Sequence, residues 1–430
     1  MTTAVKRRSA RLVSALAVVG AGAVLLSACS SGSTGGSNTA FNYLGQTENT
    51  TIVGTLKTLS TGECTAENKA LPLKATTNPG SSFDQKLQLL AGQNALPNMS
   101  MAAGTPSLMK QFISAGKLKD LSSVAGVSDQ ILPAAKSTIE KLYGTDKLYV
   151  LPTEFNIEGI WYNKKIFQDN GIEVPKTWNA LVDASVKLKA AGVQPISTDG
   201  KDGWPITRLI GDYIFRDLGP DALKDVADGK AKLTDASYVK AADAVASLGK
   251  QGFFGDAVGS IDYNTMINSF LTGKAAMMYN GSWVLANFAD KTQNQIGEDN
   301  IGYMPFPAVS GGKGSIDQVP SNVGVPVTFA SKNFDGKVGD WVSCIAKNYG
   351  NQVLADSGVV SGFTITKQPS SVPSLTKTVQ DVAAKTTTSV LWFEALFSAK
   401  ATTVSSNNAS QLVNGSIDGA QFMQLVQDAK

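Results

Sequence analysis

The sequence predicts an α/β fold, in which helices pack on a parallel sheet. Three observations carry this prediction. Short apolar runs alternate with longer amphipathic segments along the chain. The 430 residues are enough for two ordinary domains. An apolar content of 43% and a charged content of 17% are typical of a soluble globular protein.

The first set of elements follows residue 39. The segment at 81–93 shows the helical pattern best, because serines precede it and Phe83, Leu87 and Leu90 stand at helical spacing. The expected strands are residues 40–45, 71–77 and 98–103, and the expected helices are residues 50–60, 81–93 and 107–118.

A second set begins near residue 151. A helix is expected over 175–192, because proline stands at its start and glycine at its end. Another is expected over 238–252, and residues 265–279 are expected to run from a helix into a strand. Residues 324–331 read as a strand of the first set's type, and helices then dominate to the end. No internal repeat or heptad array is present.

Composition excludes several functions. The chain has no histidine, so it has no histidine-based catalytic triad, general base or metal site. The net charge of +3 gives no strong field for nucleic acid. The three cysteines, Cys29, Cys64 and Cys344, are too sparse and too far apart for a thiolate zinc site. We therefore expect neither a metal nor a cofactor.

The N-terminus has the pattern of a secretory leader over residues 1–28. Four cations, Lys6, Arg7, Arg8 and Arg11, precede a short apolar run at 12–28. Leu26, Ser27 and Ala28 before Cys29 resemble the lipobox of bacterial lipoproteins, in which the cysteine is lipidated and becomes the first mature residue. The alternative is an uncleaved anchor helix that ends in a chance cysteine.

A flexible tether is expected over residues 29–39, which are rich in serine and glycine. Removal of the four leader cations would leave a mature net charge near −1. A diacyl anchor on Cys29 would hold the protein at a membrane surface without spanning it.

Four stretches together resemble a known family. They are residues 148–196, which contain "YNKKIF" and "PKTW", residues 270–288 with "GKAAMMYNGSW", residues 301–307, and residues 411–429. These stretches are similar to the bacterial extracellular solute-binding proteins of ABC importers, and most to the maltose-binding-protein-like, carbohydrate-binding group. The resemblance covers nearly the whole mature chain.

The resemblance implies a periplasmic-binding-protein-like fold of the class II type, with two α/β lobes, a hinge and a sugar held in the cleft between them. Lobe one would comprise residues 40–150 and 310–365, and lobe two residues 151–309 and 366–430. The protein would be a monomer that closes on its ligand and docks on a membrane permease. A lipobox leader further suggests that the protein is anchored to the outer face of the cell membrane of a Gram-positive-type bacterium.

A sugar site needs aromatic platforms for the apolar ring faces and polar side chains for the hydroxyl groups. The resemblance places a stacking aromatic at Trp283, although a core tryptophan is the alternative. Asn280 would contact a hydroxyl group or build the turn. Asn156 falls where the maltose type carries a carboxylate that faces the cleft, and the flanking Glu154 and Glu158 read as surface charge.

The remaining candidates come from both lobes. In lobe two, Asp199 is the first choice for hydroxyl binding and Asp202 the second, while Trp204 either stacks on ligand or packs beside Pro205. Near the C-terminus the family often has a second stacking tryptophan, which gives Trp392 with the nearby Glu394; helix packing is the alternative. In lobe one, Glu48 and Thr105 follow expected strands, where ligands of α/β sheets usually lie.

Cys64 and Cys344 both fall in the expected lobe one, and an oxidising compartment outside the cell allows a disulfide between them. Two other function classes stay open beside sugar capture. One is a secreted carbohydrate-active enzyme with paired carboxylates, although no acidic pair stands in a recognisable hydrolase motif. The other is a structural lipoprotein without a ligand.

Overall fold

The structure, a computed structural model, describes residues 38–386 and 388–430. The expected leader, the lipidation residue Cys29 and most of the tether lie outside the described residues. Within the described part, no helix has both the length and the apolar character that a membrane span requires.

The first sheet has five strands in the order β2-β1-β3-β10-β4. β1 is parallel to both β2 and β3, as the alternation of strands and helices predicts. The prediction of a parallel sheet is wrong for β10, which is antiparallel to β3 and β4 because it enters from a distant part of the chain. The strands are β1 Phe41–Gln46, β2 Leu73–Asn78, β3 Met99–Met101, β4 Val150–Leu151 and β10 Val327–Phe329.

Amphipathic helices cover this sheet. α1 shows why: Asn49 caps its N-terminus through a hydrogen bond from the Ile52 N–H, and Ile52, Leu56 and Leu59 form one buried face. α1 packs against α13. The helices of this lobe are α1 Thr50–Thr61, α2 Thr65–Ala70, α3 Phe83–Gly92, α4 Pro106–Ser114, α5 Pro133–Tyr143 and α13 Gly336–Ser357.

The second sheet is mixed, with strand order β11-β9-β5-β7-β6 and β8 paired to β5. β5 is antiparallel to β7, β8 and β9, whereas β6 is parallel to β7 and β9 to β11, so the parallel prediction fails here as well. The strands are β5 Asn156–Asn163, β6 Gln194–Ser197, β7 Ala275–Gly281, β8 Ile301–Met304, β9 Val319–Asn322 and β11 Ser389–Val390.

α8 is the central helix of the second lobe and is buried along most of its length. Gly203 precedes it with φ of +75°, a conformation that glycine adopts without strain, and Pro205 occupies its first turn. The helices around the second sheet are α6 Lys164–Asp169, α7 Trp178–Ala190, α8 Trp204–Leu218, α9 Ala222–Ala227, α10 Ala236–Lys250, α11 Tyr263–Leu271, α12 Leu285–Ala289, α14 Ser374–Lys385, α15 Ala399–Val413 and α16 Gly419–Ala429.

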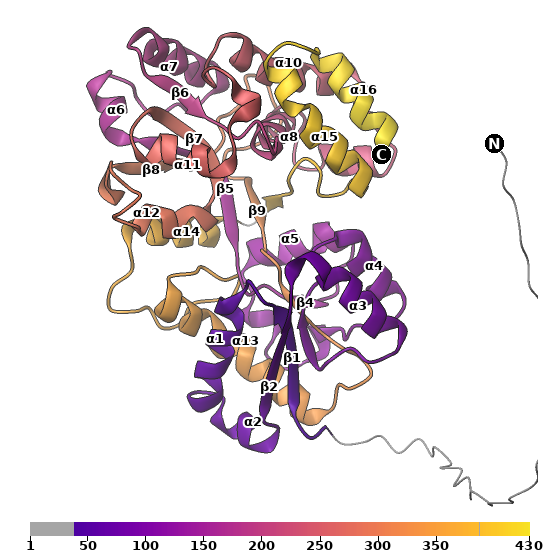
Figure 1. The fold of residues 1–430 in the computed structure, drawn as a ribbon. Coiled ribbons are helices and arrows are strands. Elements are labelled where there is room, and N and C mark those ends of the chain that lie inside the picture. The colour runs from indigo at the N-terminus through magenta and orange to yellow at the C-terminus, as the bar shows by residue number, and fades with distance from the viewer. Residues whose placement is uncertain (1–37, 387) are drawn as a thin grey trace, which may run out of the picture. The chain divides into compact units, whose positions relative to one another are not determined.

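Each lobe is built from separated segments of the chain. β10 and α13 come late in the sequence but join the first lobe, and the chain then returns to the second lobe to form α15 and α16 (Figure 1). The residue limits expected for the two lobes stay a prediction.

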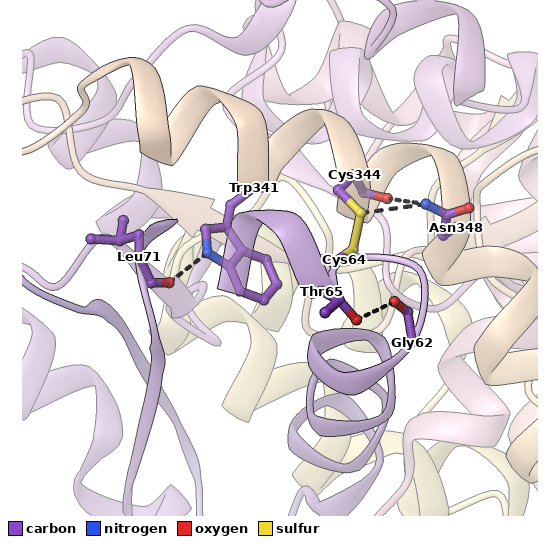
Figure 2. The surroundings of a disulfide bond; sticks show 7 residues. All are labelled: Gly62, Cys64, Thr65, Leu71, Trp341, Cys344 and Asn348. Atoms are coloured by element: carbon purple, nitrogen blue, oxygen red, sulfur yellow. Dashed lines mark hydrogen bonds between the residues drawn. A yellow bond between two sulfur atoms is a disulfide. The ribbon is translucent and has the colours of Figure 1, made fainter. Parts of the chain in front are cut away.

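A disulfide joins Cys64, at the N-cap of α2, to Cys344 within α13 (Figure 2). On the same side of α13, the Trp341 indole N–H donates to the carbonyl oxygen of Leu71 at 2.9 Å. The bond that the sequence allowed therefore forms, and it fixes α2 to a helix 280 residues away in sequence. Because both sulfurs are in the disulfide, they are not thiolate ligands for a metal.

Candidate functional site

The end of β7 sets the position of Trp283. Asn280 and Gly281 lie in register with Gly159 and Glu158 of β5, and the chain then enters a short 3-10 turn at Ser282–Val284. The Trp283 ring folds back over Gly281, where an added Cβ would lie 2.0 Å from a ring carbon. Only glycine leaves room for the indole in this position.

Trp283 belongs to an aromatic cluster in the second lobe, formed with Trp204, Tyr263 and Trp392. The Trp283 N–H donates to the Tyr263 hydroxyl group at 2.8 Å. The Trp204 ring lies 5.8 Å from Trp283 and 5.9 Å from Tyr263, between ring centres. Trp204, Trp283 and Trp392 are each half-buried, so part of every indole stays accessible to a ligand.

Arg208 connects Trp392 to the rest of this cluster. Its guanidinium group lies 5.7 Å from the centre of the Trp204 ring and 5.1 Å from that of Trp392. Its Nε is 2.9 Å from Glu158 Oε2, and its Nη1 is 3.7 Å from Glu394 Oε2. The distances fit ion pairs, but neither nitrogen makes a well-directed hydrogen bond. Charge and ring contacts therefore hold the side chain.

The expectation that Glu158 is surface charge is wrong. Its side chain is fully buried because β5 lies inside the sheet. Asn322 Nδ2 donates to Glu158 Oε1 at 3.1 Å, and Asn156 Nδ2 donates in turn to Asn322 Oδ1 at 3.3 Å. Glu154 is half-buried rather than exposed, and burial raises the pKa of its carboxyl group.

Asp199 is completely buried, whereas Asp202 is exposed. Asp199 Oδ1 accepts a hydrogen bond from the Asp202 N–H at 2.8 Å, and Oδ2 has no partner among the described residues. Burial raises the pKa of Asp199 to about 6, and the Asp202 charge adds to the effect. Asp199 is therefore a carboxyl group that can gain a proton at mildly acidic pH.

Asn280 is fully buried, and its hydrogen bonds stay within the protein. Its Oδ1 accepts from the Gly281 N–H at 2.9 Å, its Nδ2 donates to the Tyr263 hydroxyl group at 3.3 Å, and its carbonyl oxygen accepts from the Trp161 indole at 3.0 Å. These contacts fit the turn-building alternative, because they set the backbone before Trp283 and orient Tyr263.

Thr105 and Glu48 lie in the first lobe. Thr105 is the N-cap of α4 and lines a cavity of about 380 Å³ together with Trp392 and Glu394. Its N–H donates to Asp84 Oδ2 at 3.2 Å. Glu48 is exposed and accepts from the Gly80 N–H at 2.9 Å, and it lines neither this cavity nor the next one described.

A second cavity, of about 250 Å³, lies at the other end of the aromatic cluster. Trp283 and Asn156 line it, together with Glu154 just before β5 and residues 357–360 at the C-terminal end of α13. The aromatic cluster thus has a cavity at each end.

Eight of the ten predicted ligand residues lie around this cluster in the second lobe. They are Asn156, Asp199, Asp202, Trp204, Asn280, Trp283, Trp392 and Glu394. Sequence reasoning missed Tyr263 and Arg208. Arg208 had a signal, because it stands four residues after Trp204 and thus on the same helix face. Tyr263 had none, since only the fold brings α11 beside β7.

Comparison with known proteins identifies the family. The family described as bacterial extracellular solute-binding protein matches residues 65–333, more than half of the chain. The chain belongs to this family. The resemblance inferred from the sequence motifs is thereby confirmed.

This solute-binding protein is 25% identical over 311 residues to the multiple sugar-binding protein of Streptococcus mutans serotype c, a match that covers 70% of each chain. It is 30% identical over 181 residues to the sn-glycerol-3-phosphate-binding periplasmic protein of Shigella flexneri, which covers 40% of this chain and 39% of the relative. Among solved structures, it superposes on a chitin oligosaccharide binding protein with a TM-score of 0.73 and 24% identity, over 91% of this chain and 98% of that one. The two-lobed fold follows from that likeness.

Proposed function

We propose that this solute-binding protein captures a mono- to short oligosaccharide between its lobes and delivers it to the permease of an ABC importer. The aromatic cluster is the observation that carries the proposal. Its half-buried indoles offer flat apolar surfaces for sugar rings. Glu394 lines a cavity with Trp392 and the exposed Asp202 precedes Trp204 by two residues, so both are candidate partners for hydroxyl groups, whereas Asp199 would first have to become accessible. The Streptococcus relative is named a multiple sugar-binding protein, which supports the same ligand class.

We infer binding rather than catalysis from the state of the carboxylates. A glycosidase needs one carboxyl group as acid and a second as base or nucleophile, both within reach of the substrate. Glu158 is fully buried and paired to Arg208, and Glu394 is 6% exposed and accepts a hydrogen bond from Ser405. Neither carboxylate is free to attack a glycosidic bond.

The test is a thermal-shift panel of neutral mono-, di- and trisaccharides on the purified mature protein. A ligand that binds only the folded state raises Tm, so at least one sugar should do so in a concentration-dependent way. Calorimetry then gives the affinity, and chromatography of the sugar after incubation checks for turnover. Absence of any shift over the panel would favour the structural lipoprotein, and turnover would favour the enzyme.

Trp283 is the residue whose removal should reveal the site. Trp283→Ala removes the ring surface and should weaken binding of the sugar found in the panel by about tenfold or more, since aromatic contacts in desolvated sites are worth about 1–3 kcal/mol. Trp283→Phe keeps a ring and should recover much of the affinity. Calorimetry on both variants measures the effect, and unchanged affinity in the alanine variant would refute the stacking role.

We further propose that Cys29 is lipidated and anchors the protein, as a monomer, to the outer face of the cell membrane. The residues "LLSAC" and the serine- and glycine-rich stretch after them support this proposal. Mass spectrometry of the protein from a lipoprotein-processing host should find a diacylglycerol on Cys29. Cys29→Ala should then release the protein into the soluble fraction, and release of the unaltered chain would contradict the proposal.

A further inference from the structure

We propose that Glu158, Arg208 and Glu394 form a charge filter in the wall of the second lobe, which accepts uncharged carbohydrates and rejects phosphorylated or carboxylated ones. The inference rests on the proposed carbohydrate function and goes beyond it, because it assigns the charge of the ligand and the residues that select it. Sequence similarity does not decide whether the ligand is neutral or charged, since one relative is named for a sugar and another for a phosphate ester.

Arg208 is the basic group within the aromatic cluster, and its charge is already matched. Glu158 lies 2.9 Å from Nε, and Glu394 lies 3.7 Å from Nη1. Two carboxylates thus face one guanidinium group, so the charge of Arg208 is compensated within the protein. An incoming phosphate would have to displace one of them to pair with Arg208.

Neither carboxylate is free to move aside. Glu158 also accepts hydrogen bonds from Asn322 Nδ2 at 3.1 Å and from the Tyr279 hydroxyl group at 3.4 Å. Glu394 accepts one from the Ser405 hydroxyl group at 3.2 Å, which fixes its other oxygen. Both side chains are at least nine-tenths buried. Arg208 therefore stays neutralised whether or not a ligand is present.

Charged groups around the aromatic cluster also oppose the binding of an anion. Glu394 lines the 380 Å³ cavity beside Trp392, so an anion placed there meets a carboxylate directly. Asp199 and Asp202 add negative charge near Trp204 at neutral pH. Lys110 lines the same cavity, and partial desolvation and the charge of Lys224 lower the pKa of its ammonium group, which disfavours the charged form there. A neutral sugar ring is not repelled by these carboxylates, whereas like charges in a desolvated site repel each other strongly.

The experiment compares neutral and charged forms of the same sugars. The probes are glucose, galactose, maltose and trehalose, each with its 6-phosphate, together with glycerol 3-phosphate. For any probe sugar that binds the mature protein, the 6-phosphate should bind at least about tenfold more weakly. This difference in affinity between the neutral sugar and its 6-phosphate should become smaller when NaCl is raised from about 0.02 M to about 0.5 M, because salt screens charge repulsion but leaves neutral contacts unchanged.

The variant Glu394→Gln tests whether Glu394 causes the discrimination against 6-phosphates. It keeps the shape and the acceptor for Ser405 but removes one negative charge. The ratio of the dissociation constants of 6-phosphate and neutral sugar should fall by about tenfold or more. Glu173→Gln, the same change at an exposed site in the loop after α6, is the matched control and should leave the ratio as it is. A merely structural role of Glu394 would weaken both ligands equally.

Each outcome decides one proposal. A wild-type protein that binds a 6-phosphate or glycerol 3-phosphate as tightly as a neutral sugar overturns the charge filter but not solute capture. A Glu394→Gln variant that folds and keeps the wild-type ratio overturns the role of Glu394. If none of the neutral probes binds, and the wider sugar panel is also negative, then the carbohydrate function itself fails, and the filter fails with it.

Discussion

Gly281 decides where Trp283 can lie, so its replacement tests the site without removing an aromatic ring. In Gly281→Ala the new Cβ would fall 2.0 Å from a Trp283 ring carbon, and the indole must therefore move. We expect sugar affinity to drop by about tenfold, as for loss of the ring itself. Calorimetry measures the drop. Gly54→Ala in α1 is the control, because a Cβ there meets nothing within 4 Å and should leave affinity unchanged.

The raised pKa of Asp199 should make the stability of the protein depend on pH. Its pKa is about 6 in the folded protein, above the ordinary 3.8, so the folded state holds the proton more tightly than the unfolded state. The stabilisation from this difference is complete below about pH 4 and is lost as pH rises through about 6, by at most about 3 kcal/mol. Asp199→Asn cannot titrate.

The measurement for Asp199 is urea unfolding of the wild-type protein and of Asp199→Asn at several values between pH 4 and pH 7. The free energy of unfolding of the wild type should fall relative to that of the variant as pH rises. A constant difference between the two proteins across this range would show that Asp199 keeps its ordinary pKa.

Residue types were predictable from the sequence, but their electrostatic setting was not. The motif "YNGSW" and the loop around Trp204 pointed to the right region, because indoles among polar residues are unusual in a core. Glu158 looked like surface charge, since one sequence position does not show that β5 is covered on both faces. Its partner Arg208 lies 50 positions further along and meets it only through the packing of α8 on the sheet.

At the scale of elements, local pattern was sufficient for helices and strands but not for strand direction. The expected helix at 50–60 and strand at 71–77 match α1 and β2, because periodicity and capping are local properties. β10 also falls within its expected segment, yet it is antiparallel to β3 and β4. Pairing direction depends on where the chain re-enters a sheet, and no nearby residue encodes that route.

The disulfide is the element-scale feature with the clearest expected effect on stability. It joins α2 to α13 across 280 residues of sequence, so its removal frees a very long loop in the unfolded chain. We expect the Cys64→Ser/Cys344→Ser double variant to lose about 2–5 kcal/mol of unfolding free energy. Denaturant unfolding measures the loss, and reduction of the wild type with dithiothreitol should reproduce it. Equal stability of oxidised and reduced protein would contradict the prediction.

At the scale of the whole molecule, Lys141 on α5 is a charged contact between the two lobes. Its Nζ donates to the carbonyl oxygen of Ser389 in β11 at 3.0 Å and lies 3.5 Å from Asp221 Oδ1, at the N-cap of α9. α5 also packs beside β9 and β11. Lys141 also lines a small cavity together with Trp392, at one end of the aromatic cluster, and its contact can favour one arrangement of the lobes.

Lys141→Met should therefore weaken sugar binding, because it removes a contact that holds one arrangement of the lobes. The Asp221 side chain is 65% exposed, and partly exposed ion pairs are worth at most about 1 kcal/mol, so we expect a loss of no more than about fivefold. Small-angle scattering should show that a given sugar concentration compacts the variant less than the wild type. Lys136→Met removes a lysine from the same helix that pairs only with Glu140, 3.9 Å away on the surface, and should behave as wild type. If Lys141→Met binds and compacts like that control, Lys141 does not couple the lobes.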